Sequence, residues 1–156
     1  GLGFRYKEET DIDLNPICDA CATMSQDKVG ALILLVQENN LNEIVETGVS
    51  INAIISKPLI ENIFFKNSPL YDGAMAIANN KIEAARCILP ITQNINLPGS
   101  YGLRPRAGIG ITENSDCIAI VVSEETGSIR IIKNGRVHDV KSSEMKAKIK
   151  ELSSKK

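Results

Sequence analysis

Three short stretches of the sequence combine acid, positive charge and glycine, the residue types that can bind a polyphosphate together with its metal ion. They are "YDGA" at residues 71–74, "LRPRAGIG" at 103–110 and "SEETG" at 123–127. A carboxylate near a turn can ligate a divalent cation, arginines bind phosphate oxygens in bidentate geometry, and glycines let backbone amides approach an anion. Each stretch alone is also typical of an ordinary turn or a solvated loop. The prediction of a site depends on their combination, because all three fall in loops at strand ends, where open sheets tend to build ligand sites.

Other nucleotide-binding and catalytic motifs are absent from the sequence. There is no GxxxxGK[ST] motif, and "GIGITENS" at 108–115 is not GxGxxG and precedes a predicted strand instead of following one. His138 is the only histidine, which excludes a multi-histidine metal site and argues against a Ser-His-Asp or Cys-His centre.

The four cysteines point to packing instead of metal or redox chemistry. "CDAC" at residues 18–21 has CxxC spacing, but no second CxxC or CxxH supplies the remaining ligands of a zinc site. Ile17, Cys21 and Met24 recur at helical spacing, so we interpret these cysteines as small residues of a buried helix face. Unpaired cysteines of this kind suit a reducing cytosol.

Composition sets the size of the fold and excludes some partners. The chain has 156 residues, of which 43% are hydrophobic, enough for one domain with a real core. Its net charge is -1, which argues against a nucleic-acid coat or a polybasic membrane contact. No stretch approaches the roughly 20 apolar residues of a membrane span. An anion site must therefore be local.

Hydrophobic patterning predicts a single α/β domain, a mixed sheet of about five to seven strands flanked by helices on both faces. We expect residues 1–12 to form an N-terminal arm and residues 13–156 the domain. Residues 39–52 are predicted as turns around a short helical piece, and 104–115 as a short helix or irregular turn. The other predicted elements are helices over 15–28, after Ser56 and from Ser142, strands over 29–36, 74–78, 81–89 and 117–122, and a hairpin about Asn134-Gly135.

The order and spacing of the three stretches resemble the diadenylate cyclase domain, which condenses two ATP molecules into cyclic di-AMP and releases pyrophosphate. Asp72-Gly73-Ala74 matches that family's Asp-Gly-Ala motif, and residues 123–127 match its Ser-Glu-Glu-Thr-Gly turn. Segments such as "VGALILLV", "ETGVSINAIIS" and "LIENIFFKNSPLYDGA" also look like family segments, so the resemblance covers residues 15–140. It is closest to the membrane-associated branch, whose cyclase domain follows a small transmembrane region.

The sequence departs from the family pattern at three positions near the expected site. The Arg-His-Arg motif reads Arg104-Pro105-Arg106, the residue before it is Leu103 where threonine is usual, and Tyr71 replaces a histidine that precedes Asp-Gly-Ala. Proline donates no hydrogen bond, and it biases the residue before it, Arg104, toward an extended conformation.

The resemblance implies roles for individual residues. Asp72 is implied as a metal ligand and activator of the attacking 3′-hydroxyl, with Mg²⁺ or Mn²⁺ as the cofactor and Glu124 as a second metal ligand. Gly73 and Ala74 are implied to allow close approach of the nucleotide. The implied nucleotide- and phosphate-binding residues are Thr47, Gly48, Leu103, Arg104, Arg106 and Ser123.

The same resemblance implies ATP as substrate, cyclic di-AMP as product, and a homodimer in which two nucleotide sites face each other. It implies a cytoplasmic location, with a tether to the cytoplasmic face of the membrane left open for the natural full-length protein. Two alternatives stay open. One is a degenerate family member that binds ATP or cyclic di-AMP without turnover, and the other is an unrelated α/β scaffold with ordinary turns.

Overall fold

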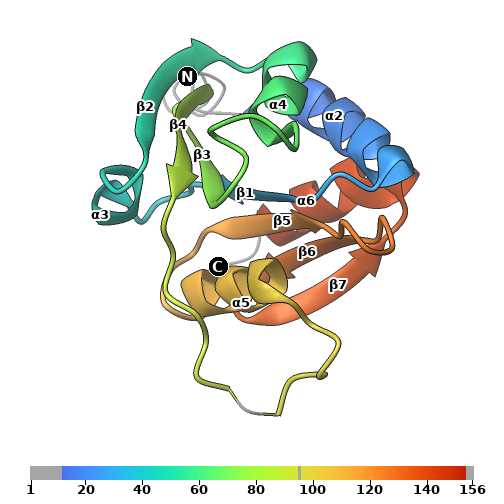
Figure 1. Ribbon diagram of the computed structural model, residues 1–156. Helices are drawn as coiled ribbons and strands as arrows, with labels where there is room; N and C mark the ends of the chain where they lie inside the picture. The colour runs from blue at the N-terminus through green and yellow to red at the C-terminus, as the bar shows by residue number, and fades with distance from the viewer. Residues whose placement is uncertain (1–11, 95, 154–156) are drawn as a thin grey trace, which may run out of the picture.

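The computed structural model describes residues 12–94 and 96–153, and in it the chain forms one seven-stranded sheet with helices on both faces (Figure 1). Of the predicted N-terminal arm, residues 1–11 lie outside the described residues. The strands are β1 (Ala31–Leu35), β2 (Val49–Ile54), β3 (Ala74–Ala78), β4 (Lys81–Cys87), β5 (Ile118–Val122), β6 (Ile129–Lys133) and β7 (Arg136–Val140). The helices are α2 (Leu14–Asp27), α3 (Asn42–Val45), α4 (Lys57–Phe64), α5 (Leu103–Glu113), the 3₁₀ helix η1 (Ser142–Glu144) and α6 (Met145–Ser153).

The sheet is mixed, as predicted. Its strand order is β2-β4-β3-β1-β5-β6-β7. β1 and β3 run parallel, and every other neighbouring pair is antiparallel. The antiparallel pairs β3-β4, β5-β6 and β6-β7 are joined by turns, and the helices α3, α4 and α5 lie in the connections between the other consecutive strands.

The central strand β1 divides the hydrophobic core into two clusters. All five of its residues are buried, as expected for a strand covered on both faces. Ile33 and Leu35 pack in the cluster with residues of α2, α4 and α6, whereas Leu32 and Leu34 pack in the cluster with residues of α5. Figure 1 shows α5 lying across β5 and β6, with α2 and α4 together on another side of the sheet. In the described parts of the chain, no helix combines the length and apolar character that a membrane crossing requires.

Two parts of the fold differ from the sequence-based expectation. Residues 49–52 were expected to belong to a turn, but with Ala53 and Ile54 they form the edge strand β2, which pairs only with β4 and is irregular between Ser50 and Ala53. Val49, Ile51 and Ala53 do alternate with the polar residues Ser50 and Asn52, but this strand signal is short and directly follows the turn at Gly48.

The second difference concerns the start of α5. Arg104 was expected to be extended because it precedes a proline, yet it lies in the first turn of this regular helix. Pro105 is the third residue of α5, and the first backbone N–H groups of a helix have no partner within it. The missing N–H of Pro105 therefore costs the helix no hydrogen bond.

Candidate active site

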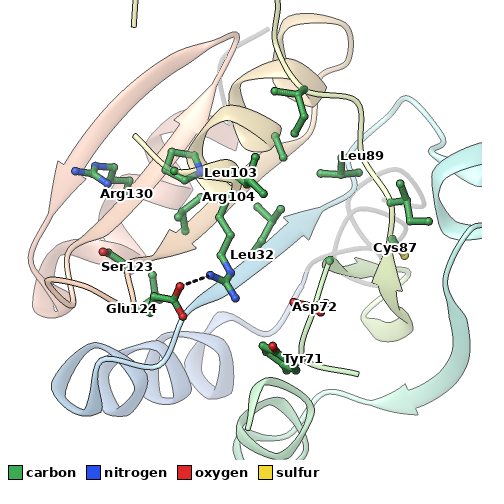
Figure 2. A pocket seen from close by; sticks show the side chains of 18 of the residues that line it. Leu32, Tyr71, Asp72, Cys87, Leu89, Leu103, Arg104, Ser123, Glu124 and Arg130 are labelled. Carbon is green, nitrogen blue, oxygen red and sulfur yellow. Dashed lines mark ion pairs between the residues drawn. The ribbon is translucent and has the colours of Figure 1, made fainter. Parts of the chain in front are cut away.

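A cavity of about 740 Å³ lies where α5 meets the loops that follow β4 and β5, and the three stretches singled out in the sequence converge on it (Figure 2). The turn before β3, the start of α5 and the turn after β5 each contribute part of its wall. Their lining residues are Tyr71, Asp72 and Gly73, then Gly102, Leu103, Arg104, Pro105 and Ala107, and finally Ser123, Glu124 and Glu125. The fold thus joins segments that are about 20 to 50 residues apart in the sequence, a distance that only tertiary folding can close.

Gly73 places Asp72 at the edge of the cavity. Its φ of 81° is in the left-handed region, and a Cβ atom there would lie 2.6 Å from the carbonyl oxygen of Cys87. A side chain at position 73 would therefore be strained and would also collide with β4. Asp72 is exposed and lines the cavity, while Ala74 is buried at the start of β3 and does not line it.

The side chain of Arg104 extends from the first turn of α5 into the cavity. Its guanidinium is packed against Gly30, where a Cβ atom would stand 2.7 Å from Cζ. Its Nη1 lies 3.6 Å from Oε1 of Glu124, the ion pair drawn in Figure 2. The Arg104 side chain is 22% exposed and that of Glu124 is 61% exposed, so a bound anion can reach the arginine.

Arg106 does not line the cavity. Its Nε donates a hydrogen bond to the carbonyl oxygen of Tyr101 (3.0 Å), and its Nη2 donates one to the carbonyl oxygen of Pro98 (3.2 Å). Successive residues of an α-helix are about 100° apart around its axis, so residues two apart point in different directions. The expected pair of phosphate-binding arginines is therefore split, and Arg106 holds the loop before α5.

The turn after β5 is held by its own side chains and by α2. Ser123 Oγ accepts hydrogen bonds from the backbone N–H groups of Glu125 and Thr126, both at 3.2 Å. Ser25 of α2 donates from Oγ to the carbonyl oxygen of Gly127 at 2.5 Å. These bonds fix Ser123 beside the cavity, and its hydroxyl proton is still available for a ligand because a serine hydroxyl is both donor and acceptor.

Thr47 and Gly48, expected near the nucleotide, lie behind the cavity wall and do not line it. Thr47 Oγ1 accepts a hydrogen bond from the backbone N–H of Ile88 (2.8 Å) and donates one to the carbonyl oxygen of Ile44 (2.6 Å). Gly48 packs so closely on β4 that a Cβ atom would lie 2.5 Å from the carbonyl oxygen of Ala85. Both residues therefore position the end of β4, where the chain enters the cavity wall.

Two arginines and an apolar wall of the cavity were not predicted from the sequence. Arg86 and Arg130 line it, and neither belongs to a motif. The position of Arg130 could have been predicted from strand periodicity. Arg130 precedes Ile132 by two positions in β6, so the two side chains point to the same, inward face of the sheet. The apolar wall is formed by Leu32, Ile88, Leu89, Ile91 and Leu103.

The acids of the cavity suit a metal ion that takes part of its ligands from a substrate. Among residues 12–94 and 96–153, no group of three or more His, Cys, Asp or Glu side chains could hold a metal ion. Figure 2 shows Asp72 and Glu124 on different sides of Arg104. A cation such as Mg²⁺ is usually held by one or two carboxylates together with water and substrate phosphates. Asp72 fits that arrangement, whereas Glu124 is paired with Arg104.

Comparisons with known proteins identify the family and several relatives of the chain. The pattern of the family described as "DAC: DisA bacterial checkpoint controller nucleotide-binding" matches residues 18–137. The chain is 38% identical over 136 residues to the cyclic di-AMP synthase CdaA of Bacillus subtilis, covering 87% of this chain and 50% of that protein. It is 40% identical over 152 residues to a diadenylate cyclase of Listeria monocytogenes, covering 96% of this chain and 56% of that protein. The chain thus spans about half the length of these curated relatives.

Solved structures show the same fold. A crystal structure of DacA from Staphylococcus aureus, a double-cysteine variant, superposes with a TM-score of 0.86 at 34% identity, covering 90% of this chain and 94% of that chain. A hypothetical membrane-spanning protein from Bacillus cereus gives a TM-score of 0.81 at 37% identity, covering 83% and 64% of the two chains. With the family pattern matched from Cys18 to Val137, the chain belongs to the DAC family of nucleotide-binding domains.

Proposed function

We propose that the cavity binds ATP and that two copies of the chain condense two ATP molecules into cyclic di-AMP, releasing pyrophosphate. The observation that carries this proposal is the convergence of Asp72, Arg104 and Ser123, from three separate segments, on one cavity. The curated relatives of Bacillus subtilis and Listeria monocytogenes, named cyclic di-AMP synthase and diadenylate cyclase, support it.

The cavity has the size and the two kinds of wall that a nucleotide needs. Its volume of about 740 Å³ lies in the usual range for small-molecule sites. Ile88, Leu89 and Ile91 offer apolar surface to the base. Arg104 and Ser123 offer a guanidinium and a hydroxyl to the phosphates, where charge-assisted hydrogen bonds are the strong ones.

The proposed reaction joins the 3′-oxygen of one ATP to the α-phosphorus of the other, while the bond from that phosphorus to the pyrophosphate oxygen breaks. Asp72 would accept the proton of the attacking hydroxyl or orient that hydroxyl. Arg104 would stabilise charge on the phosphate oxygens in the transition state. A divalent ion bound with the triphosphate, Mg²⁺ or Mn²⁺, would offset the charge of the leaving pyrophosphate.

Each protomer supplies one such cavity, and the reaction needs two nucleotides, so we propose that two protomers face each other as a homodimer. Specific activity should then fall as the protein is diluted through its dimer dissociation constant. Activity per chain that stays constant in a strictly monomeric sample would contradict the dimer. Because ATP is the substrate, we place the domain in the cytoplasm, and the relatives' greater length leaves room for a membrane tether outside this sequence.

A second candidate function is nucleotide binding without turnover. Pro105 lines the cavity where the family motif has a histidine, and Tyr71 lines it where a histidine is also usual. These changes remove imidazole groups but leave Arg104 and Ser123 in place. They therefore act against catalysis more than against binding, and measurement of both distinguishes the two candidates.

The deciding experiment incubates the protein with ATP and Mg²⁺ or Mn²⁺ and measures cyclic di-AMP by chromatography. We expect product from the parent and none from Asp72→Asn, with unchanged thermal unfolding because Asp72 is exposed. Asp19→Asn, an exposed acid on α2 outside the cavity, is the matched control. ATP binding without product would select the second candidate, and an absence of ATP binding would refute both.

A further inference from the structure

We propose that Arg130, which belongs to no recognised motif, binds the phosphate chain of the nucleotide as a second guanidinium beside Arg104. This inference rests on the proposed function of the cavity and adds a residue to it. Arg130 lines the cavity together with Arg104 and Ser123. Figure 2 shows it on the same side of the cavity as Ser123 and Glu124, across from Asp72.

The sheet register directs Arg130 toward the cavity. Its Cα atom is paired with that of Val121 in β5, and Val121 is 1% exposed and also lines the cavity. Paired residues on neighbouring strands project to the same face of a sheet. The neighbouring residues on this face, Val121 and Ile132, are apolar and buried in the core. They offer no hydrogen-bond acceptor to the guanidinium of Arg130, and a charged group beside the core needs such a partner.

Two contacts hold Arg130 in one orientation. Its Nε lies 3.2 Å from Oδ1 of Asp139, its cross-strand neighbour, and its Cζ lies 4.8 Å from the centre of the Tyr101 ring. The Arg130 side chain is 20% exposed, whereas that of Asp139 is 73% exposed, so solvent screens the ion pair and leaves it weak. The contacts orient the guanidinium and engage only its Nε–H group.

The terminal nitrogens of Arg130 remain available. Only Nε is engaged by Asp139, and within the described residues neither Nη atom donates a hydrogen bond to the protein. A guanidinium carries five N–H donors, four of them on the terminal nitrogens. This edge matches two oxygens of a phosphate group.

A second cation is needed because Arg106 does not supply one. The Arg106 guanidinium is bound to the carbonyl oxygens of Pro98 and Tyr101, and Pro105 has no donor. Without Arg130, the triphosphate would meet Arg104, whose charge Glu124 partly offsets at 3.6 Å. The other arginine of the cavity, Arg86, already donates a hydrogen bond from Nη1 to the carbonyl oxygen of Pro69 (3.4 Å). Arg130 therefore takes the phosphate-binding role that was expected of Arg106.

The test compares affinities for ATP, without added metal, and for adenosine, by isothermal titration calorimetry. We expect Arg130→Ala and Arg130→Gln to weaken ATP binding at least about tenfold, the loss typical of one charge-assisted hydrogen bond. Adenosine affinity should not change, since it lacks the phosphates. Arg136→Ala is the matched control, because Arg136 is an exposed arginine on the neighbouring strand β7 and does not line the cavity.

Other outcomes overturn the inference. Equal losses for ATP and adenosine would mean that Arg130 acts by holding Tyr101 and the loop, and unchanged ATP affinity would mean that it has no part in binding. If thermal unfolding shows that Arg130→Ala is not folded, the affinities of Arg130→Gln for ATP and adenosine decide by the same criteria. Arg104→Ala is measured in the same series. A folded parent that does not bind ATP refutes the proposed function as well, whereas a parent that binds ATP and loses affinity only in Arg104→Ala refutes the role of Arg130 alone.

Discussion

The guanidinium of Arg104 lies against the backbone of Gly30, so close that a Cβ atom on Gly30 would stand 2.7 Å from both Cζ and Nη1. Gly30 immediately precedes β1, and Arg104 is in the first turn of α5. The absence of a side chain at position 30 therefore makes the space in which this arginine lies. Gly30 belongs to none of the three motif stretches, yet it determines where the positive charge of the cavity is placed.

Gly30→Ala should move Arg104 without unfolding the protein. The atoms that a methyl group would meet are the far end of a flexible side chain, so we expect a loss of less than about 1 kcal/mol in the free energy of unfolding. Turnover should fall at least about tenfold, the effect of shifting a positioned charge. Gly99→Ala is the control, because a Cβ atom there has no neighbour within 4 Å. Turnover equal to that of the control would show that Arg104 need not lie over Gly30.

Much of the fold could be predicted because its signals are local. β1 is a continuous apolar run, and α4 begins directly after its N-cap residue Ser56, whose Oγ accepts a hydrogen bond from the N–H of Leu59 at 3.3 Å. β2 was not predicted, because the alternation of Val49, Ile51 and Ala53 with polar residues is short and the strand is irregular around Asn52 (φ of 50°). Its strand conformation comes from pairing with β4, which is a tertiary interaction.

The candidate site was predictable as a set of segments but not in its contacts. Asp72, Arg104 and Ser123 were all expected in it, and all line the cavity. Arg106 was expected there too, but the direction of a helical side chain depends on the rotation of the whole helix, which packing fixes. Gly108 of α5 approaches Ile132 so closely that a Cβ atom would lie 2.8 Å from its Cδ1. This contact with β6 sets the helix orientation, and the sequence does not show it.

Arg106→Ala should weaken the loop instead of the phosphate contacts. It removes two hydrogen bonds to the carbonyl oxygens of Pro98 and Tyr101, each worth on the order of 1 kcal/mol net. We expect faster amide hydrogen exchange around residues 98–102 and a similar loss of affinity for ATP and adenosine, because this loop forms part of the cavity wall. Arg104→Ala should instead weaken the binding of ATP and leave the binding of adenosine unchanged. A loss restricted to ATP in Arg106→Ala would place Arg106 on the phosphates in the bound state.

The free energy of unfolding should fall in alkaline solution, because buried thiols keep their protons in the folded chain. Burial raises the pKa of the Cys87 thiol from 9.0 to about 11, and burial also raises the pKa of Cys21. Above pH 9 the unfolded chain loses these protons while the folded chain keeps them, so unfolding becomes more favourable as pH rises. For Cys87 this loss develops between pH 9 and about 11 and reaches about 3 kcal/mol.

The measurement is urea unfolding at a series of pH values. Cys87→Ala should be less stable than the parent at pH 7, because Cys87 is completely buried and its removal leaves a cavity. Its stability should fall less steeply than that of the parent between pH 9 and 11, since the Cys87 thiol no longer titrates. Parallel curves for the two proteins would contradict the raised pKa of this thiol.

Pro105 is the position where the sequence and the proposed chemistry are most in conflict. It is buried, lines the cavity and occupies the third position of α5. Replacing it with histidine would not disturb the helix, because the new backbone N–H belongs to the first turn, where such groups have no helical partner. The imidazole would add a hydrogen-bond donor beside Arg104, in the place where the family motif has one.

We therefore expect Pro105→His to raise turnover while changing ATP affinity by less than about threefold. A donor that acts in the transition state is typically worth about 10²–10³-fold in rate, and the phosphate contacts of Arg104 would already supply the affinity. Cyclic di-AMP formation under saturating ATP and calorimetric ATP affinity are measured for the parent, Pro105→His and Pro105→Ala. The alanine variant removes the proline without adding an imidazole, so a rate increase shared by both variants would be due to backbone relaxation. If Pro105→His is no faster than Pro105→Ala, the site works without a donor at this position, or the change at Tyr71 limits the rate, which Tyr71→His in the Pro105→His background would test.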